Sequence, residues 1–374
     1  MAIQSDATMK IAFRVDASIE IGTGHVMRCL TLADALKEQG AECHFICREH
    51  LGHLNALIIE RGHIVYPLPY IEQYKQSEHN NKAEELAHSS WLGVTQAEDF
   101  AACSLLLKSL QPEWLIVDHY AIDERWHKEL RPYCQKIMVI DDLADRKHDC
   151  DLLLDQTFGR NSDDYQSFVP EYCQVLCGAE YALLRPEFAE WRAYSLKRRE
   201  NGQLNHLLIN LGGVDKDNIT TQILRELSYI SLPNSCRITV VMGVTAPWVK
   251  QVEEQAEQMP WLTEVKVGVN NMAELMANSD LAVGAAGATS WERCCLGLPT
   301  IMIVLADNQK LIASELEAMA AAVCLDREQI KQEILAFKLL TLINESESLK
   351  SMGQQAATIT EGKGVKVILQ YVGL

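Results

Sequence analysis

The chain has 374 residues, 48% of them apolar, and its 34 Lys and Arg face 51 Asp and Glu, which gives a net charge of −17. This length suits two domains of roughly 170 residues better than one. The negative charge disfavours binding to nucleic acid or to a membrane, where a basic surface supplies most of the affinity. The polar residues 1–8 predict an unstructured extension without the pattern of a signal peptide, and no run reaches the ~18 apolar residues of a membrane span. We therefore expect a cytoplasmic protein, monomeric or weakly oligomeric.

The first half of the chain alternates short apolar runs with helical patterns. Met9–Val15 predicts a strand, a glycine turn follows, and residues 26–39 have apolar positions at helical spacing up to Gly40. Further strands are expected at 42–47, 63–68, 114–117, 136–140, 151–154 and 174–177. Such alternation is typical of a parallel sheet with helices on both faces.

A polar and basic stretch at 195–204 interrupts this pattern and is the predicted linker. Beyond it, strands are expected at 206–211, 237–242, 280–283 and 300–305, and helices at 217–227, 272–276, 289–296, 308–321, 328–342 and 365–374. The predicted fold class is therefore α/β, with two doubly wound Rossmann-like domains at 9–194 and 205–374. Ligands bind such sheets at the carboxyl ends of the strands, so the predicted active site is the cleft between the domains.

The twelve cysteines do not form a metal-binding or disulfide pattern. No Cys-x-x-Cys occurs, and most of the cysteines lie in apolar runs, which indicates free thiols packed as small hydrophobic side chains. The carboxylate pair Asp141-Asp142 has no histidine or cysteine near it at ligand spacing. We expect neither a metal nor another cofactor.

The strongest local feature is the glycine turn that precedes the first helix. Gly22 and Gly24 permit a tight turn, and His25 falls at or beside the helix start. The positive end of a helix disfavours a charged imidazole, so His25 is expected to be neutral at pH 7 and able to accept a proton from water. Arg28, one turn later, would contact a phosphate or a carboxylate. The alternative is a phosphate-binding turn whose histidine only packs.

Polar side chains also follow the strand at 114–117. Tyr120 would orient a sugar or a water through its hydroxyl, and Asp118 would either face the ligand or cap the next helix. Arg185, which lies among apolar residues, would reach a diphosphate or sugar, or else pair with Glu187 or Asp155.

Two glycine turns in the second half each follow a strand and precede a helix. Small residues let the backbone approach an anion, and a helix N-terminus favours negative charge. Thr289 and Ser290 would donate hydroxyl hydrogens to a ligand or only cap their helix, whereas Glu292 would hold the hydroxyls of a ribose. Neither turn is a Walker A motif or a dinucleotide fingerprint, which argues against a kinase, an ATPase or a dehydrogenase.

The candidate site residues fall into two groups. Catalytic roles are expected for His25 and Tyr120. Contacts with the substrate are expected for Gly24, Arg28, Asp118, Arg185, Gly212, Gly213, Gly287, Ala288, Thr289, Ser290, Glu292, Asn308 and Gln309.

Six ordered segments together resemble one family. They are FRVDASIEIGTGHVMR, IVDHY, IDDLADRKHDCDLLLDQ, CGAEYALLRPEF, NLGGVDKDN and GAAGATSWE. They are similar to the UDP-2,4-diacetamido-2,4,6-trideoxy-β-L-altropyranose hydrolases of pseudaminic acid biosynthesis, almost throughout the chain from Met9 and least at 70–95. Departures are the bulky Trp291 and the N-terminal extension, which has no counterpart.

The resemblance implies a GT-B-like fold in which the second domain holds UDP and the first faces the sugar. It implies that His25 is the catalytic base, assisted by Tyr120, and that Arg185, the glycine-rich loops and Glu292 contact the substrate. The expected reaction is a metal-independent, inverting hydrolysis to UDP and 2,4-diacetamido-2,4,6-trideoxy-L-altrose. The rival interpretations are a glycosyltransferase with the same donor site, a 2-epimerase, and a non-catalytic sugar-nucleotide sensor.

Overall fold

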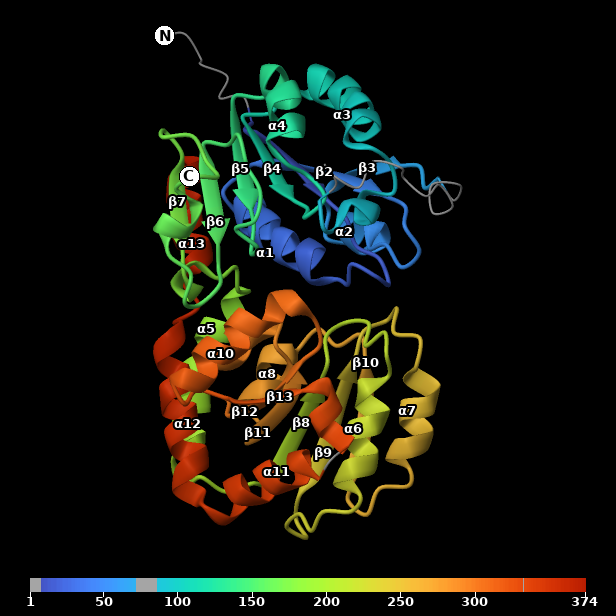
Figure 1. Cartoon of the computed structure of the whole chain (residues 1–374), viewed down its shortest axis with the longest axis vertical. Coiled ribbons are helices and arrows are strands. Elements are labelled where there is room, and N and C mark those ends of the chain that lie inside the picture. The colour runs from blue at the N-terminus through green and yellow to red at the C-terminus, as the bar shows by residue number, and fades with distance from the viewer. Residues whose placement is uncertain (1–7, 72–85, 332) are drawn as a thin grey trace. The chain divides into compact units, whose positions relative to one another are not determined.

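The computed structural model describes residues 8–71, 86–331 and 333–374, which divide into two compact units. Unit 1 contains the described residues up to Gln156 together with 160–183 and 365–374, and unit 2 contains 157–159 and 184–364. Each unit is built on one sheet of parallel strands (Figure 1).

The predicted domain limits differ from this division at two places. Residues 195–201, assigned to the linker, are helical, because α5 (Pro186–Arg198) runs into a short 3-10 turn at Arg199–Asn201. Ser195 and Arg199, which lie one turn apart in this segment, are both buried, so the segment packs within unit 2 and is not a solvated linker. The terminal helix α13 (Gly364–Val372), predicted to pack back on the body, joins the core of unit 1 and not that of the second domain.

Unit 1 has a seven-stranded sheet in the order β3-β2-β1-β4-β5-β6-β7. All seven strands predicted in this half are present, each displaced by at most one residue at either end. The strands are β1 (Lys10–Val15), β2 (Glu42–Arg48), β3 (Ile64–Leu68), β4 (Trp114–Asp118), β5 (Lys136–Ile140), β6 (Leu152–Asp155) and β7 (Gln174–Cys177). Its other helices are α1 (Gly24–Glu38), α2 (Asn55–Glu60), α3 (Gln96–Leu110) and α4 (Glu124–Leu130).

Helices cover both faces of this sheet (Figure 1). Ile11 and Phe13 of β1 pack on one face with residues of α1 and α13. Ala12, whose side chain points to the opposite face, packs with residues of α3 and α4. Burial on both faces is why these strands appear in the sequence as nearly continuous apolar runs.

Unit 2 has a six-stranded sheet in the order β10-β9-β8-β11-β12-β13. The strands are β8 (His206–Asn210), β9 (Arg237–Met242), β10 (Thr263–Val267), β11 (Leu281–Ala285), β12 (Thr300–Val304) and β13 (Val323–Asp326). Its other helices are α6 (Ile219–Leu227), α7 (Val249–Ala256), α8 (Met272–Ala277), α9 (Thr289–Cys295), α10 (Lys310–Ala318), α11 (Ile334–Asn344) and α12 (Ser346–Ile359). The central strands were predicted, but the edge strands β10 and β13 were not, because both are largely only half-buried. β10 has no continuous apolar run, and the apolar residues of β13 directly continue a run of alanines that does not mark the start of a strand.

Strand order reverses once in each sheet, and the reversal defines a switch point. It lies between β1 and β4 in unit 1 and between β8 and β11 in unit 2. The chain leaves the carboxyl ends of these neighbouring strands in opposite directions, which opens the edge of the sheet to a ligand. Most of the candidate residues lie at or shortly after these strand ends, whereas Arg185 follows β7 and both Asn308 and Gln309 follow β12.

Gly243, directly after β9, permits a close backbone approach at this edge of unit 2. A Cβ at this position would overlap the carbonyl group of Gly213, which belongs to the turn after β8. Gly243→Ala is therefore expected to lower the free energy of unfolding by about 1–3 kcal/mol, the usual cost of overpacking. Denaturant unfolding of the purified variant measures this.

Gly24→Ala is the matched control, because no atom lies within 4 Å of the added carbon and the residue opens helix α1. Its stability should equal or slightly exceed that of the wild type. Equal stability of the Gly243 and Gly24 variants would contradict the close approach of Gly243 to the backbone of Gly213.

Candidate active site

His25 and Asp118 meet at the switch point of unit 1. His25 lies in the first turn of α1, and Asp118 is the last residue of β4, paired in register with Val15 at the end of β1. The Nδ1 atom of His25 is 2.6 Å from Oδ1 of Asp118. The strand end thus places a carboxylate against one nitrogen of the imidazole.

Arg28 fixes the ionisation of Asp118. Its Nε and Nη2 donate to the two carboxylate oxygens at 2.6 Å and 2.7 Å, a bidentate pair buried from solvent. Burial acts to raise the pKa of Asp118, but the charge and hydrogen bonds of Arg28, together with those of His25, outweigh it and hold the pKa of that carboxyl well below its usual range. Asp118 is therefore a carboxylate at neutral pH.

An ionised Asp118 selects the tautomer of His25. The carboxylate accepts a hydrogen bond from Nδ1–H, which leaves Nε2 as the basic nitrogen. Among the described residues, Nε2 of His25 has no hydrogen-bond partner. The arrangement provides an oriented imidazole whose second nitrogen is able to accept a proton.

Tyr120 and Asp142 complete this network. The Tyr120 hydroxyl donates to Oδ2 of Asp142 at 2.6 Å, and Nη1 of Arg28 donates to the same oxygen at 2.7 Å. Burial, followed by the negative charge of Asp142, raises the pKa of Tyr120 well above its usual value, so the phenol stays neutral. Its ring meets the His25 ring edge to face, with centroids 4.6 Å apart. Tyr120 thus positions His25 by packing, while its hydroxyl is engaged by Asp142.

Two members of this assembly were not among the candidate site residues, although the carboxylate pair Asp141-Asp142 was noted in the sequence. Asp142 follows β5, next to β4 in the sheet, so its place after a strand end was the only signal for it. Trp91 stacks on Tyr120 with ring centroids 5.7 Å apart. It comes from the 70–95 segment that showed the weakest resemblance and of which residues 72–85 lie outside the described chain.

The structure decides between several of the alternatives in unit 1. Arg28 contacts the carboxylates of Asp118 and Asp142, the second of the two kinds of partner considered for it. The capping role considered for Asp118 is wrong, because Asp123 caps α4. In unit 2, Arg185 pairs with Glu187 at 2.9 Å, one of the two partners considered for it.

In unit 2 the glycine turns follow β8 and β11, on either side of the switch point. Gly212 has a φ of +90°, a conformation that favours glycine. Gly287 follows β11, and the Gln309 amide is the side-chain group nearest to it. The structure thus brings the turn after β11 close to the polar tip after β12, as the parallel order of these strands requires.

The residues at the start of α9 and just before it differ in how far their side chains are exposed. Ala288 is exposed and Thr289 half-buried, but Ser290 is fully buried and its hydroxyl accepts a hydrogen bond from Arg293. The Ser290 hydroxyl is thus engaged within the protein, and its contact with a ligand stays a prediction. Glu292 is half-buried, and burial raises its pKa to about 7 although Arg185 acts to lower it.

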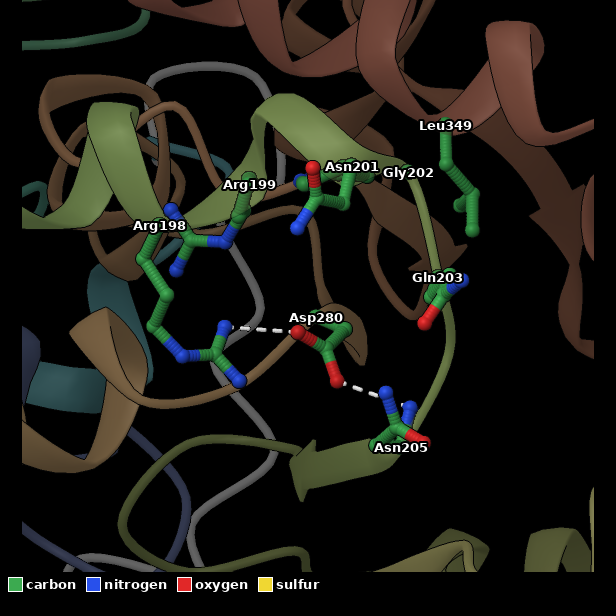
Figure 2. A pocket seen from close by; sticks show the side chains of 9 residues that line it. Arg198, Arg199, Asn201, Gly202, Gln203, Asn205, Asp280 and Leu349 are labelled. Carbon is green, nitrogen blue, oxygen red and sulfur yellow. Dashed lines mark hydrogen bonds and ion pairs between the residues drawn. The ribbon is translucent and has the colours of Figure 1, made fainter.

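A pocket in unit 2 lies at the amino-terminal ends of β8 and β11, opposite the glycine turns at their carboxyl ends. Figure 2 shows Arg198 reaching Asp280, at 2.6 Å, and the second oxygen of Asp280 accepting from the backbone N–H of Asn205 at 2.8 Å. These charges satisfy each other, and the pocket is remote from both glycine turns. It is not a candidate active site.

Three further observations bear on the site chemistry. All twelve cysteines are free. Within the described part of the chain, no group of three or more His, Cys, Asp or Glu is placed to hold a metal ion. In the same residues, no helix has both the length and the apolar character needed to cross a membrane.

Comparison with known sequences supports the predicted relationship. Residues 211–369 match the glycosyltransferase family 28 C-terminal domain. The chain is 28% identical to the UDP-2,4-diacetamido-2,4,6-trideoxy-β-L-altropyranose hydrolase of Campylobacter jejuni, over 82% of this chain and 95% of that protein. It is 26% identical to the uncharacterized protein MJ1062 of Methanocaldococcus jannaschii, over 81% of this chain but only 57% of the longer relative. The resemblance predicted from the six segments is thereby confirmed.

Comparison with solved structures confirms the fold class. MurG of Acinetobacter baumannii superposes with a TM-score of 0.67 over 98% of this chain and 99% of that one, at 15% sequence identity. The two-sheet α/β architecture is thus that of the GT-B glycosyltransferases.

Arg28→Met tests the buried network of unit 1. The substitution leaves Asp118 and Asp142 without their cation, so we expect a loss of about 3–5 kcal/mol in the free energy of unfolding at pH 7. Because the folded-state pKa of Asp118 is lowered, its stabilisation is present above the unfolded value of about 3.9 and is lost as pH falls below it. The difference between wild type and variant should therefore narrow below about pH 4, as chemical unfolding at several pH values would show.

Arg61→Met is the matched control. Arg61 pairs with Asp34 at 2.7 Å, but both side chains are about one-third exposed. Loss of this surface pair should cost less than about 1 kcal/mol. A similar cost for the two variants would refute a special role for the buried network.

Proposed function

We propose that this chain hydrolyses a UDP-linked 2,4-diacetamido-2,4,6-trideoxy sugar, the altropyranose, and releases UDP. The observation that carries the proposal is His25, held at Nδ1 by an ionised Asp118 with Nε2 available as a base. The similarity to the Campylobacter hydrolase and the family 28 domain support a role in sugar-nucleotide processing. A sensor would have no need of an oriented imidazole.

In the proposed reaction a water molecule attacks the anomeric carbon from the face opposite UDP. The new C–O bond forms as the bond to the β-phosphate oxygen breaks, and the electron pair leaves with UDP. Nε2 of His25 takes the proton of the water, and Asp118 stabilises the resulting imidazolium through Nδ1–H. Attack opposite the leaving group inverts the anomeric configuration.

The leaving group requires stabilisation of negative charge and no obligatory general acid. We assign this task to the glycine turns of unit 2, which contain Gly212, Gly213 and Gly287. The backbone at Gly212 and Gly287 is open to an anion, since a Cβ there would meet no atom nearer than 4.0 Å. Glu292 is assigned to the ribose hydroxyls and Arg185 to the substrate. Tyr120 and Arg28 act on the reaction through the positions of His25 and Asp118.

A glycosyltransferase is the second candidate, because the matched domain and the MurG likeness belong to that class of enzyme. The same oriented base would then deprotonate an acceptor hydroxyl. The difference between the two functions lies in whether water alone suffices as the nucleophile.

Turnover in ¹⁸O-water tests the function. Incubation of the UDP-sugar with the enzyme and no acceptor should give equal amounts of UDP and free sugar, with the label in the sugar and none in UDP. Free sugar incubated in parallel corrects for exchange of its anomeric oxygen with water. Label in UDP would mean attack at phosphorus, and an absence of turnover without an acceptor would favour the transferase.

His25→Gln tests the assignment of the base. Because general-base catalysis contributes about 10²–10⁴-fold, kcat should fall by at least that range while the Kd for UDP stays unchanged. His53→Gln is the control, since His53 lies in unit 1 outside the network and only accepts from the Asn55 backbone. Near-wild-type kcat in the His25 variant would exclude this mechanism.

A further inference from the structure

Arg293 is a buried cation without an acidic partner. Its side chain is 2% exposed, and among the described residues no carboxylate oxygen lies within 4 Å of its guanidinium. Nη2 donates to the carbonyl of Ala285 at 2.6 Å and to the Ser290 hydroxyl at 3.2 Å, and Nη1 donates to the Thr289 hydroxyl at 3.1 Å. Nε is buried and has no hydrogen-bond partner.

The sheet provides space for this guanidinium at the switch point. A Cβ on Gly284 of β11 would lie 2.5 Å from Nη1 of Arg293 and 3.0 Å from the carbonyl oxygen of Asn210, the last residue of β8. Only a glycine at position 284 therefore admits the cation between the ends of β8 and β11. These are the two strands from which the glycine turns assigned to UDP depart.

Arg199 shows how a buried arginine of the same unit is stabilised. It donates to the carbonyl oxygens of Met276 near the end of α8 and of Leu296 just after α9. The C-terminal ends of helices carry partial negative charge, which suits a cation. The Arg293 side chain instead turns back to the first turn of its own helix, where the partial charge is positive.

Within the described chain no carboxylate therefore contacts Arg293 directly as Asp118 and Asp142 contact Arg28, and the neighbouring Glu292 acts on its charge only at longer range. Burial lowers the pKa of Arg293 to about 10, so the group is still charged at neutral pH. Burial of an unpaired charge is costly in free energy. A bound anion at the neighbouring turn would supply the missing negative charge.

We infer that Arg293 is a positioning residue for the diphosphate of the nucleotide, acting through the Thr289 hydroxyl and through its own charge. The inference rests on the proposed function, which assigns the diphosphate to these turns. Because Arg293 donates to the oxygen of Thr289, the hydroxyl hydrogen of Thr289 is free to point to a different acceptor. Thr289 is half-buried, so this hydrogen is able to reach a phosphate oxygen outside the core.

The test compares the binding of UDP and of uridine by calorimetry. Arg293→Gln removes the charge but keeps an amide that donates to Ala285, and Arg293→Lys keeps the charge. In the Gln variant we expect the Kd for UDP to rise at least tenfold and the Kd for uridine to change less than twofold. The Lys variant should recover UDP binding to within about threefold of wild type. The ratio of the two Kd values does not depend on the fraction of folded protein.

Arg198→Met is the control, because it removes an arginine from the opposite edge of the same sheet and should leave the ratio unchanged. Equal weakening of UDP and uridine by Arg293→Gln, or no weakening of either, would overturn the inference. Should wild type bind neither UDP nor uridine, the proposed function itself would fail. Should the wild type hydrolyse the UDP-sugar while the Arg293→Gln variant keeps the wild-type ratio of the Kd for UDP to the Kd for uridine, only the inference would fail.

Discussion

The contact of a buried carboxylate, Asp118, with His25 and Arg28 is the constraint on which the chemistry of unit 1 depends. The parallel order of β1 and β4 places the first turn of α1 beside the end of β4. Without Arg28, burial would favour the protonated acid, and a protonated Asp118 would no longer select the Nδ1–H tautomer of His25. The arginine therefore acts on the histidine through the ionisation of the aspartate.

A second buried network supports the strand ends behind this contact. Arg14 pairs with Asp16 and Asp99 at 2.7 Å each, and Arg48 pairs with Asp99 at 2.8 Å. His119, next to Asp118 in the chain, is turned into this network, with Nε2 3.1 Å from Asp16 and Nδ1 accepting the backbone N–H of Ala121. Neighbouring residues at the end of β4 thus have different roles. Asp118 faces the site, whereas His119 forms hydrogen bonds that connect the strand end to the buried network. Sequence position alone does not distinguish them.

The sequence was sufficient to predict the central strands and the principal residues of the unit 1 site. Strands buried on both faces leave apolar runs, and polar residues that end such runs at parallel strands converge on one edge of a sheet. The edge strands β10 and β13 leave no comparable signal. The linker was misplaced because a helix end that is rich in basic residues and packs within unit 2 has the composition of a solvated loop. Trp91 was not identified because its contact with Tyr120 joins segments far apart in sequence, without a motif.

Arg28 and Arg293 illustrate why the roles of residues in the second half of the chain were harder to predict from the sequence. Both are buried arginines within a turn or two of a helix start, and nothing in their local sequence separates them. Arg28 is neutralised by two carboxylates, so its charge is used within unit 1 to order the base. Arg293 has no such partner among the described residues, so its charge is available to a ligand. In a chain with a net charge of −17, an anionic substrate cannot rely on a general positive field and must be attracted by local groups. A single unpaired guanidinium behind the glycine turns meets that requirement without making the surface basic.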